Sequence, residues 1–351
     1  MEPATALSRE DRVAAGWSYI AMGGSYLDIG KAEVAVGYFE RAVAVGRGER
    51  ERQLEGAALN NLGTAYARLG DARGAIGYHE QSLAIDREIG DRCGEVASLG
   101  NLGTAYADLG DARCAIGYFE QSLAIARQIG DRRREGNVLG NLGSAYRRLG
   151  DIRRAIGYHE QRLEIAHEIG DRHGESNALG NLGSAYLQLG DARRAIGFCE
   201  QQLVITREIG DRRGEGVALG NLGVAYYQLG AARRAIGFYE QCLTIHREIG
   251  DRRGEGAALG NLGEIYRRLG DARRATGYFE QCLTIHREIG DIMGVAMGLL
   301  NIALLHAQQG EPDHALPLAQ QAAEIFTRIG HAQYAQRAQQ LVTQLSLFFA
   351  L

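Results

Sequence analysis

The chain has 351 residues, 45% of them hydrophobic, and a formal net charge of −4. No global charge excess therefore predicts a nucleic acid or an anionic membrane as partner. The five cysteines are scattered and odd in number, which argues against a disulfide framework and favours a reducing compartment. No run approaches the roughly 18 apolar residues of a membrane span, and the first residues lack the pattern of a signal peptide. We expect a cytoplasmic protein.

After an N-terminal tail at 1–10, a unit of forty residues recurs along almost the whole chain. Its most regular copy, at 211–250, reads DRRGEGVALGNLGVAYYQLGAARRAIGFYEQCLTIHREIG. A fixed period of this length is the signature of stacked repeats. We expect eight repeats in 11–330, of which the first and last are degenerate: 11–50, 51–90, 91–130, 131–170, 171–210, 211–250, 251–290 and 291–330.

The first half of each repeat predicts a helix, named helix A. In 91–130 its apolar stripe follows helical spacing and consists of Leu99, Leu102, Tyr106 and Leu109. Gly110 then suits the left-handed residue that ends a helix, and Asp111 suits the N-cap of the next one. The sequence therefore predicts a tight turn into a second helix, named helix B.

Helix B carries two apolar stripes, which in 91–130 are formed by Ile116, Phe119 and Leu123 and by Tyr118, Ser122, Ile125 and Ile129. A helix that is apolar on two sides packs against its own helix A and against helix A of the next repeat. Gly103 on helix A recurs as glycine in each of the six well-formed repeats. Because a helical glycine costs about 0.5–1 kcal/mol relative to alanine, this recurrence predicts a steric need.

This pattern resembles the tetratricopeptide repeat, and the matching residues in 91–130 are Leu102, Gly103, Tyr106, Gly110, Ala115, Phe119 and Ser122. The forty-residue form, with LGNLG, YxEQxLxI and EIGDRxGE, is similar to the repeats of the Pins/LGN cell-polarity adaptors and of kinesin light chains. The resemblance implies an all-α, right-handed superhelical solenoid of helix pairs whose concave groove is lined by helices A. It also implies a non-enzymatic protein–protein interaction scaffold that binds an extended or partly helical peptide.

One asparagine recurs in each helix A, at Asn61, Asn101, Asn141, Asn181, Asn221, Asn261 and Asn301. The resemblance places this row in the groove, where the asparagines of the Pins/LGN group bind the backbone of a peptide. An amide has donors and an acceptor, so it can pair with the main chain of any ligand sequence. The alternative is that each asparagine caps a turn or bonds a neighbouring helix.

Residues one turn further along helix A differ between repeats and are expected to line the same groove. Those predicted to contact the partner are Arg68, Arg147, Arg148, Tyr227, Arg267 and Arg268. The alternation of positive and neutral segments suits an acidic peptide with an apolar segment, since arginine binds carboxylates in a bidentate fashion. Solvated arginines with incidental ion pairs are the alternative.

Two further rows of arginines stand at helix starts, at 153–154, 193–194, 233–234 and 273–274 and at 132–133, 212–213 and 252–253. Because acidic residues interleave with them, we expect salt bridges between repeats and no nucleic-acid interface. Cys242 and His246, like Cys282 and His286, stand one helical turn apart, a spacing compatible with metal ligation. Equivalent helices of adjacent repeats are too far apart to complete a tetrahedron, so no metal, cofactor or catalytic residue is predicted.

The last segment, 331–351, is predicted to form a capping helix, because its end, LVTQLSLFFAL, is apolar enough to need covering. The alternative is that this C-terminal end forms the seam of a homodimer or filament, which would make the protein a self-assembling module. A further alternative is a sensor arm that controls a separately encoded enzyme.

Overall fold

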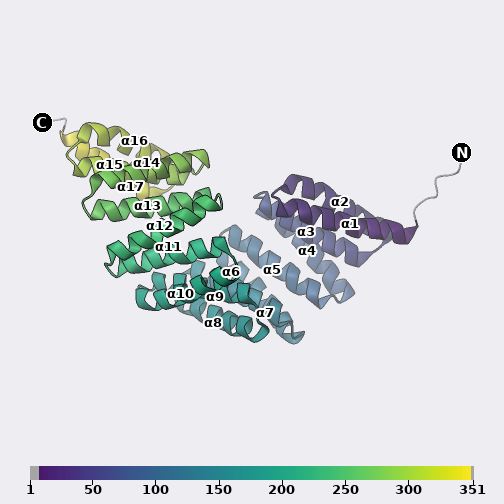
Figure 1. The fold of residues 1–351 in the computed structure, drawn as a ribbon. Coiled ribbons are helices and arrows are strands. Elements are labelled where there is room, and N and C mark those ends of the chain that lie inside the picture. Colours follow the sequence, from purple (N-terminus) through teal and green to yellow (C-terminus); the bar gives the residue numbers. More distant parts are fainter. Residues whose placement is uncertain (1–7, 349–351) are drawn as a thin grey trace. The chain divides into compact units, whose positions relative to one another are not determined.

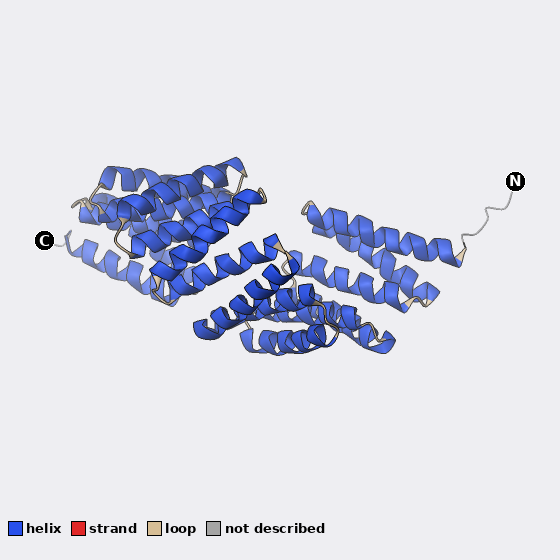
Figure 2. Cartoon of the chain, turned by 60° about the horizontal axis from the view of Figure 1, so that its bottom comes forward, coloured by secondary structure: helices blue, strands red, loops and turns tan. Residues whose placement is uncertain are grey.

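The computed structural model describes residues 8–348, and over that range it shows helices joined by short loops, with no strand (Figure 1). Figure 2 shows the same chain coloured by secondary structure. The expected all-α architecture of helix pairs is confirmed. The helices of the first four pairs are α1 Arg9–Asp28, α2 Ala32–Glu49, α3 Arg52–Arg68, α4 Ala72–Ile89, α5 Arg92–Asp108, α6 Ala112–Gln128, α7 Arg132–Leu149 and α8 Ile152–Ile169. The others are α9 Arg172–Gln188, α10 Ala192–Glu208, α11 Arg212–Gln228, α12 Ala232–Glu248, α13 Arg252–Arg268, α14 Ala272–Glu288, α15 Ile292–Gln308, α16 Pro312–Arg328 and α17 Ala332–Phe348.

The chain forms two compact units, Met1–Asn181 and Leu182–Leu351, and each is described by itself. In the first unit each helix from α1 to α7 packs against the next, and α1, α3, α5 and α7 also touch in succession. In the second unit consecutive helices pack from α10 to α17, and α15 also touches α17. Odd-numbered helices up to α15 are thus the predicted helices A, and even-numbered helices are the predicted helices B.

Aspartates begin most of the helices, as the sequence predicts. Asp91 accepts a hydrogen bond from the backbone N–H of Gly94 at 2.9 Å, and other aspartates act in the same way at the starts of α4, α6 to α8, α10, α11 and α13 to α15. Gly110, in the turn before α6, has a φ of +85° in the left-handed region. At α12 the N-cap is Ala231, which offers no side-chain acceptor, so this helix start lacks a contribution of about 1 kcal/mol.

The recurring glycine of helix A allows helix B to approach closely. A Cβ atom at Gly103 would lie 2.5 Å from Cε1 of Phe119, and one at Gly143 would lie 2.5 Å from Cε1 of His159. Both distances are shorter than side chains tolerate, so any larger residue would push the two helices apart. The predicted steric need is confirmed.

The core lies between the helix pairs. Leu99 and Leu102 of α5 are completely buried, and Phe119 of α6 is almost so. The prediction that Leu109 belongs to the apolar stripe is wrong, because 47% of this residue is exposed. It follows the last residue of α5 as the C-cap, where the chain already turns away from the core.

The last helix, α17, covers the end of the second unit by packing against α16. It contributes Ala338, Leu341 and Leu345 to the core, whereas Leu347 is exposed. The predicted tail at 1–7 and the end of the predicted capping helix at 349–351 lie outside the described residues. Within residues 8–348, none of the helices combines the length and the apolar character that a bilayer crossing requires.

Candidate functional site

The asparagine row lies on the helices A, where most of its amides are unpaired. Asn61 Nδ2 donates to the carbonyl of Ala57 in its own helix at 2.8 Å, and Asn101 Nδ2 donates to Asn60 Oδ1 at 2.9 Å. For these two residues the alternative of a structural hydrogen bond holds. Across residues 8–348, no side-chain hydrogen bond is formed by the exposed or half-buried Asn141, Asn181, Asn221, Asn261 and Asn301. These five amides are available to a ligand.

A cavity of about 480 Å³ lies in the second unit beside α13, α14 and α15. Four of the residues predicted for the groove line it together: Asn261, Arg267, Arg268 and Asn301. Cys282 and His286 of α14 and Arg337 of α17 also line it. The cavity therefore brings two unpaired amides of the helices A together with two guanidinium groups of α13 and one of α17.

The two arginines of α13 at this cavity share one carboxylate. Arg267 donates from Nε and a terminal nitrogen to the two oxygens of Glu264 at 2.8 and 2.7 Å, and Arg268 Nε donates to Glu264 Oε1 at 2.8 Å. Burial by itself would raise the pKa of Glu264, but these hydrogen bonds outweigh it and hold the pKa below its ordinary value. Glu264 is therefore ionised near neutral pH, and it reduces the positive charge that the sequence predicts here.

The residues one turn further along helix A, which differ between repeats, are named the variable row. Two others of them bond to the repeat before them. Arg68 donates to the carbonyl of Leu27, and Arg148 donates to the carbonyl of Ala107 at 2.8 Å. Both acceptors are carbonyls at the C-terminal end of the preceding helix A, where cations are favoured. These bonds could not be predicted from the sequence, because every residue has a backbone carbonyl and the acceptor therefore does not depend on the residue type.

The remaining predicted residues, Arg147 and Tyr227, hold buried polar atoms without a partner, namely Nε of Arg147 and the hydroxyl of Tyr227. Burial is the main cause that raises the pKa of Tyr227, and the guanidinium of Arg268 lies 5.3 Å from the centre of its ring. A buried polar group without a partner costs about 1–3 kcal/mol. Both positions are therefore places where a ligand can complete the hydrogen bonding.

The ion pairs of the arginines at the starts of the helices A join residues of the same repeat, whereas pairs between repeats were predicted. Arg132 at the start of α7 contacts Glu135 and Glu168, and both lie in its own repeat. The expectation of salt bridges between repeats is therefore wrong for this residue, and the same geometry recurs at Arg212 and Arg252. The link between repeats is made by Arg127 at the end of α6, whose Nε donates to Glu135 Oε1 at 2.8 Å.

The arginines at the start of helix B also act within their own repeat. Arg154 Nε lies 3.2 Å from Oδ2 of the N-cap Asp151, and its guanidinium lies 5.4 Å from the ring centre of Tyr146. The same stacking on a tyrosine of helix A is made by Arg194, Arg234 and Arg274. For Arg154, Arg234 and Arg274 too, the expectation of salt bridges between repeats is wrong, because their contacts join helix A to helix B across the turn.

The cysteine–histidine pairs are engaged in packing. Cys242 Sγ donates to the carbonyl of Gly216 at 3.3 Å, and His246 Nδ1 lies 3.1 Å from Oδ2 of Asp251. Burial raises the pKa of the Cys242 thiol to about 11. This sulfur is therefore held as a neutral thiol between α11 and α12.

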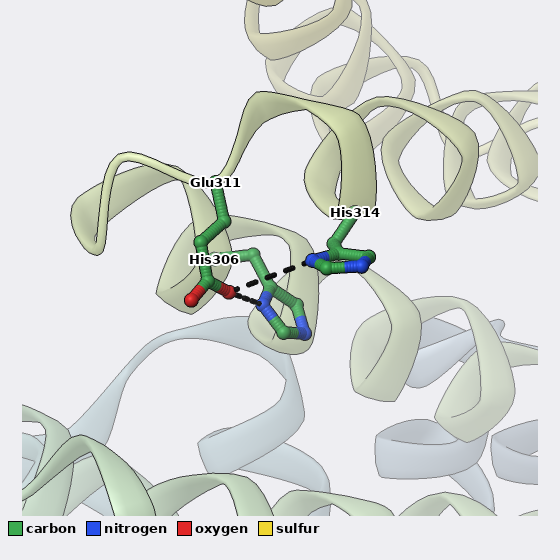
Figure 3. Close-up of side chains that lie close together, drawn as sticks. All are labelled: His306, Glu311 and His314. Atoms are coloured by element: carbon green, nitrogen blue, oxygen red, sulfur yellow. Dashed lines mark hydrogen bonds and ion pairs between the residues drawn. The ribbon is translucent and has the colours of Figure 1, made fainter.

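A different cluster, formed by side chains of types that can ligate metals, lies at the turn between α15 and α16 (Figure 3). His306 Nδ1 lies 2.6 Å from Glu311 Oε2, and His314 Nδ1 lies 3.7 Å from the same oxygen. The potential ligand atoms of the three residues lie within 4.8 Å of one another. The hydrogen bond with His306 is the main cause that holds the pKa of Glu311 below its ordinary value. The sequence signal that we missed is the replacement of the usual tyrosine and arginine by histidines at this turn.

The helix pairs and the cavity beside the helices A define a helical-repeat protein of the interaction-scaffold class. The chain belongs to the tetratricopeptide repeat family, whose model matches residues 12–88, 94–168, 174–248, 235–288 and 254–328. Stacked repeats of this type present extended binding surfaces to other proteins. A comparison with curated proteins gives no match.

Solved structures share the fold at low sequence identity. A Signal Transduction ATPase with Numerous Domains that carries a tetratricopeptide repeat sensor, from Pyrococcus horikoshii, is 17% identical with a TM-score of 0.68 over 94% of this chain and 52% of that one. This chain therefore spans about half of that protein. The apo form of RapI is 14% identical with a TM-score of 0.63 over 79% of this chain and 99% of that one. A Rap protein in complex with Competence and Sporulation Factor is 14% identical with a TM-score of 0.60 over 96% and 99% of the two chains.

Proposed function

We propose that this protein is a non-enzymatic, cytoplasmic scaffold that binds an extended or partly helical peptide along the face of its helices A. The observation that supports this most directly is the cavity beside α13 and α15, which brings Asn261 and Asn301 together with three arginines. A groove lined by unpaired amides and guanidinium groups suits a peptide with carboxylate side chains and a main chain that needs hydrogen-bond partners.

The spacing of the amides suits an extended ligand. Packed helices lie about 8–10 Å apart, so equivalent amides in successive repeats are separated by roughly 20 Å. A strand that rises about 3.3 Å per residue would meet one amide about every six residues. Main-chain recognition at this interval would leave the side chains of the ligand free to contact the variable residues between the amides.

The experiment is to select binders from a random twelve-residue peptide library on the intact chain and to measure the best peptides by fluorescence anisotropy. The variant N141A/N181A/N221A removes three unpaired amides. We expect it to bind at least about tenfold more weakly, because each lost hydrogen bond contributes about 0.5–1.5 kcal/mol. Circular dichroism checks that its helix content is unchanged.

The matched control is Asn61→Ala, which removes an amide that is already bonded within α3. Peptide affinity should be unchanged in this control. If the triple variant kept the affinity of the natural chain, or if the control lost as much affinity as the triple variant, binding through the asparagine row would be ruled out.

A second candidate function is a sensor arm that controls a separately encoded enzyme. It is favoured by the fold shared with the tetratricopeptide repeat sensor of the Pyrococcus horikoshii ATPase and with the Rap protein bound to Competence and Sporulation Factor. A sensor should change its dimensions when a selected peptide binds, which small-angle X-ray scattering measures. An unchanged scattering curve at saturation would favour the plain scaffold.

Self-assembly through the C-terminal end is the remaining alternative, favoured by the exposure of Leu347 on α17. Size-exclusion chromatography with light scattering gives the mass in solution. A dimer that becomes a monomer in Leu347→Asp would support this alternative, whereas a monomer at all concentrations would exclude it.

A further inference from the structure

The repeat at 131–170 contains a basic cluster that has no acidic partner. Its members are Arg147 of α7 and His159 and Arg162 of α8. The position of Arg162 holds an uncharged side chain in the other well-formed repeats: Ser82, Ser122, Gln202, Cys242 and Cys282. Arg162 is thus a charged residue at a position where the fold elsewhere packs a neutral one.

The side chains of His159 and Arg162, which belong to α8, lie over one stripe of α7, and Arg147 belongs to that stripe. A Cβ atom at Gly140 would lie 2.9 Å from Cδ and 3.0 Å from Cζ of Arg162, so the guanidinium stem rests on this glycine. His159 rests on Gly143 in the same way. Arg147 follows Gly143 by one helical turn, which continues the stripe. Asn141, an exposed member of the asparagine row, comes directly after Gly140.

None of the three side chains is compensated within residues 8–348. Arg162 and Arg147 form no hydrogen bond or ion pair there, and Nε of Arg147 is buried without a partner. His159 is 0% exposed, and neither of its ring nitrogens has a partner. Both arginine side chains are half-buried, and a buried polar atom without a partner, such as Nε of Arg147, is unfavourable. A bound anion would supply the missing hydrogen-bond partners.

The charge of the cluster comes from its arginines. Burial, followed by the charges of Arg162 and Arg147, lowers the pKa of His159 to about 4, so the imidazole is neutral near pH 7. The nearby acidic group is Asp171, whose Oδ1 accepts the backbone N–H of Gly174 at 3.0 Å as the N-cap of α9. Its ion pair with Arg162 is not formed, and Arg133 adds a further positive charge at the rim.

The equivalent place in the second unit shows what the cluster lacks. There Glu264 bonds to Arg267, which corresponds to Arg147, whereas α7 carries Ser144 at the position of Glu264. Cys282, which stands at the position of Arg162, lines the cavity of about 480 Å³ in that unit. The cluster of α7 and α8 thus has arginines at both positions and lacks the carboxylate.

We infer that Arg147 and Arg162 form an anion subsite that binds a carboxylate of the peptide partner next to Asn141. This deepens the proposed peptide binding, on which it rests. Arginine suits the role because its planar fork donates two parallel hydrogen bonds to a carboxylate. The carboxylate comes either from an Asp or Glu side chain or from the C-terminus of the partner, and the two sources share this chemistry.

The first test uses acetate as the probe and does not need a peptide. Sodium acetate replaces sodium chloride at constant ionic strength, and the melting temperature of the intact chain is followed. Acetate should raise the melting temperature of the natural chain, because a ligand that binds only the folded state stabilises it. Arg162→Ser should abolish this rise, since serine is tolerated at this position and donates to a helix-A carbonyl at Ser82 and Ser122.

The matched control is Arg154→Ser, which removes an arginine of the same helix that is paired with Asp151. It should keep the acetate response. An equal response of the natural chain and Arg162→Ser, or no response in the natural chain, would overturn the subsite. A subsite that responds to acetate while no peptide binds would refute only the proposed peptide binding.

The second test separates the two carboxylate sources. A selected peptide is synthesised with a free or amidated C-terminus, and with each Glu or Asp replaced by its amide. Loss of one charge should weaken binding to the natural chain by about 10- to 100-fold, because hydrogen bonds to charged groups contribute about 1.5–3 kcal/mol. Binding to Arg162→Ser should not respond to that change. If every amide form bound both chains equally, the subsite would be refuted.

Independently, the geometry points to a divalent metal site formed by His306, Glu311 and His314 (Figure 3). Two imidazoles and a carboxylate are a ligand set that suits Zn²⁺, Ni²⁺ and Cu²⁺. Both Nδ1 atoms face the same Oε2 atom, at 2.6 and 3.7 Å. His306 comes from α15 and His314 from α16, so a bound ion would clamp the two helices across their turn.

The corresponding residues in another repeat show that this cluster replaces a structural contact. Tyr266, Asp271 and Arg274 occupy the same places at the turn between α13 and α14. There the guanidinium lies 5.1 Å from the tyrosine ring centre and 3.3 Å from the aspartate. The two imidazole rings, whose centres lie 5.5 Å apart, keep a ring contact at this turn and add metal-ligating nitrogens.

The test is isothermal titration of the intact chain, freed of metal by a chelator, with zinc chloride. We expect one Zn²⁺ bound by the natural chain and by the control His167→Ala, a histidine near Glu175 in the first unit. The variant H306Y/H314R, which carries the side chains of Tyr266 and Arg274, should fold and lose this ion. No Zn²⁺ bound by the natural chain, or undiminished binding by the variant, would overturn the site.

Discussion

The α7–α8 pair and the α13–α14 pair build different groove sites on the same scaffold. In the second, Cys282 lines a cavity of about 480 Å³, and Glu264 offsets part of the charge of the three arginines there. In the first, Arg162 stands at the position of Cys282, and Ser144 stands at the position of Glu264. Two side chains therefore distinguish a site whose arginines share a carboxylate from one whose arginines have no acidic partner, without changing the helices. Differences between repeats, more than the repeat itself, determine what each segment of the groove can bind.

The largest expected effect is a loss of stability when the aromatic residue under either site is replaced by alanine. Phe279→Ala should destabilise the protein by about 3–5 kcal/mol, because a completely buried ring is lost. His159→Ala should cost less, since the ring that is removed carries two buried nitrogens without partners. Urea unfolding followed by circular dichroism compares the two midpoints. Equal shifts would contradict the difference that we describe between the two sites.

Acid should destabilise the α7–α8 site. The pKa of His159 is lowered from 6.5 to about 4 in the folded protein, so its stability contribution is complete above pH 6.5 and is lost as the pH falls to 4. A shift of this size corresponds to at most about 3 kcal/mol. His159→Phe, which introduces the residue found at Phe119 and Phe279, should reduce the loss of stability between pH 7.5 and 4.5.

The comparison for this pH dependence is another buried histidine, His79, whose pKa burial also lowers to about 4. His79→Phe should reduce the acid loss by a similar amount, and the double variant by about the sum. Urea midpoints at the two pH values provide the measurement. If His159→Phe had the pH profile of the natural chain, the imidazole would not be the group that titrates.

Ser144→Glu should convert the first site toward the second. A glutamate there would stand one turn before Arg147, as Glu264 stands before Arg267, and should stabilise the protein by about 1 kcal/mol. It should also reduce the acetate response that we predict for Arg162 and Arg147. The control Ser144→Gln introduces a side chain of the same size without its charge. A similar gain in melting temperature for both variants would exclude a specific ion pair.

The fold could be predicted from the sequence because its causes are local and repeated. The left-handed glycines, the aspartate caps and the glycine under each helix-B residue at the position of Phe119 recur every forty residues, so each copy supports the others. Leu109 was misassigned because periodicity alone cannot show where a helix ends. The repeat pattern thus predicts the helices and their packing well, but it predicts the residues at which the helices end less well.

The candidate site could be predicted only in part. The asparagine row and the arginines at 267–268 are visible in the sequence, and the cavity brings them together. Arg162 looks like an ordinary surface arginine, since only the close approach of α8 to Gly140 places it over α7. In the sequence, Glu264 is seen only as the replacement of a residue that carries a hydroxyl in other repeats, such as Ser144. Its ion pairs with Arg267 and Arg268 depend on side-chain geometry and could not be predicted. Whether a charged side chain has a partner depends on its neighbours in space, and these neighbours cannot be recognised from a single sequence.

The smallest expected effect separates structural arginines from ligand-binding ones in the variable row. Arg148 donates to the carbonyl of Ala107 near the end of α5, whereas Arg268 bonds to Glu264 in its own helix. Because both side chains are largely exposed, each change to alanine should alter stability by less than about 1 kcal/mol. Hydrogen exchange is more sensitive to such local changes. It should accelerate at the last turn of α5 in Arg148→Ala and remain unchanged there in Arg268→Ala. If α5 exchanged at the natural rate in both variants, the bond to Ala107 would contribute nothing to the repeat junction, and Arg148 would be free to serve the ligand as the sequence first predicts.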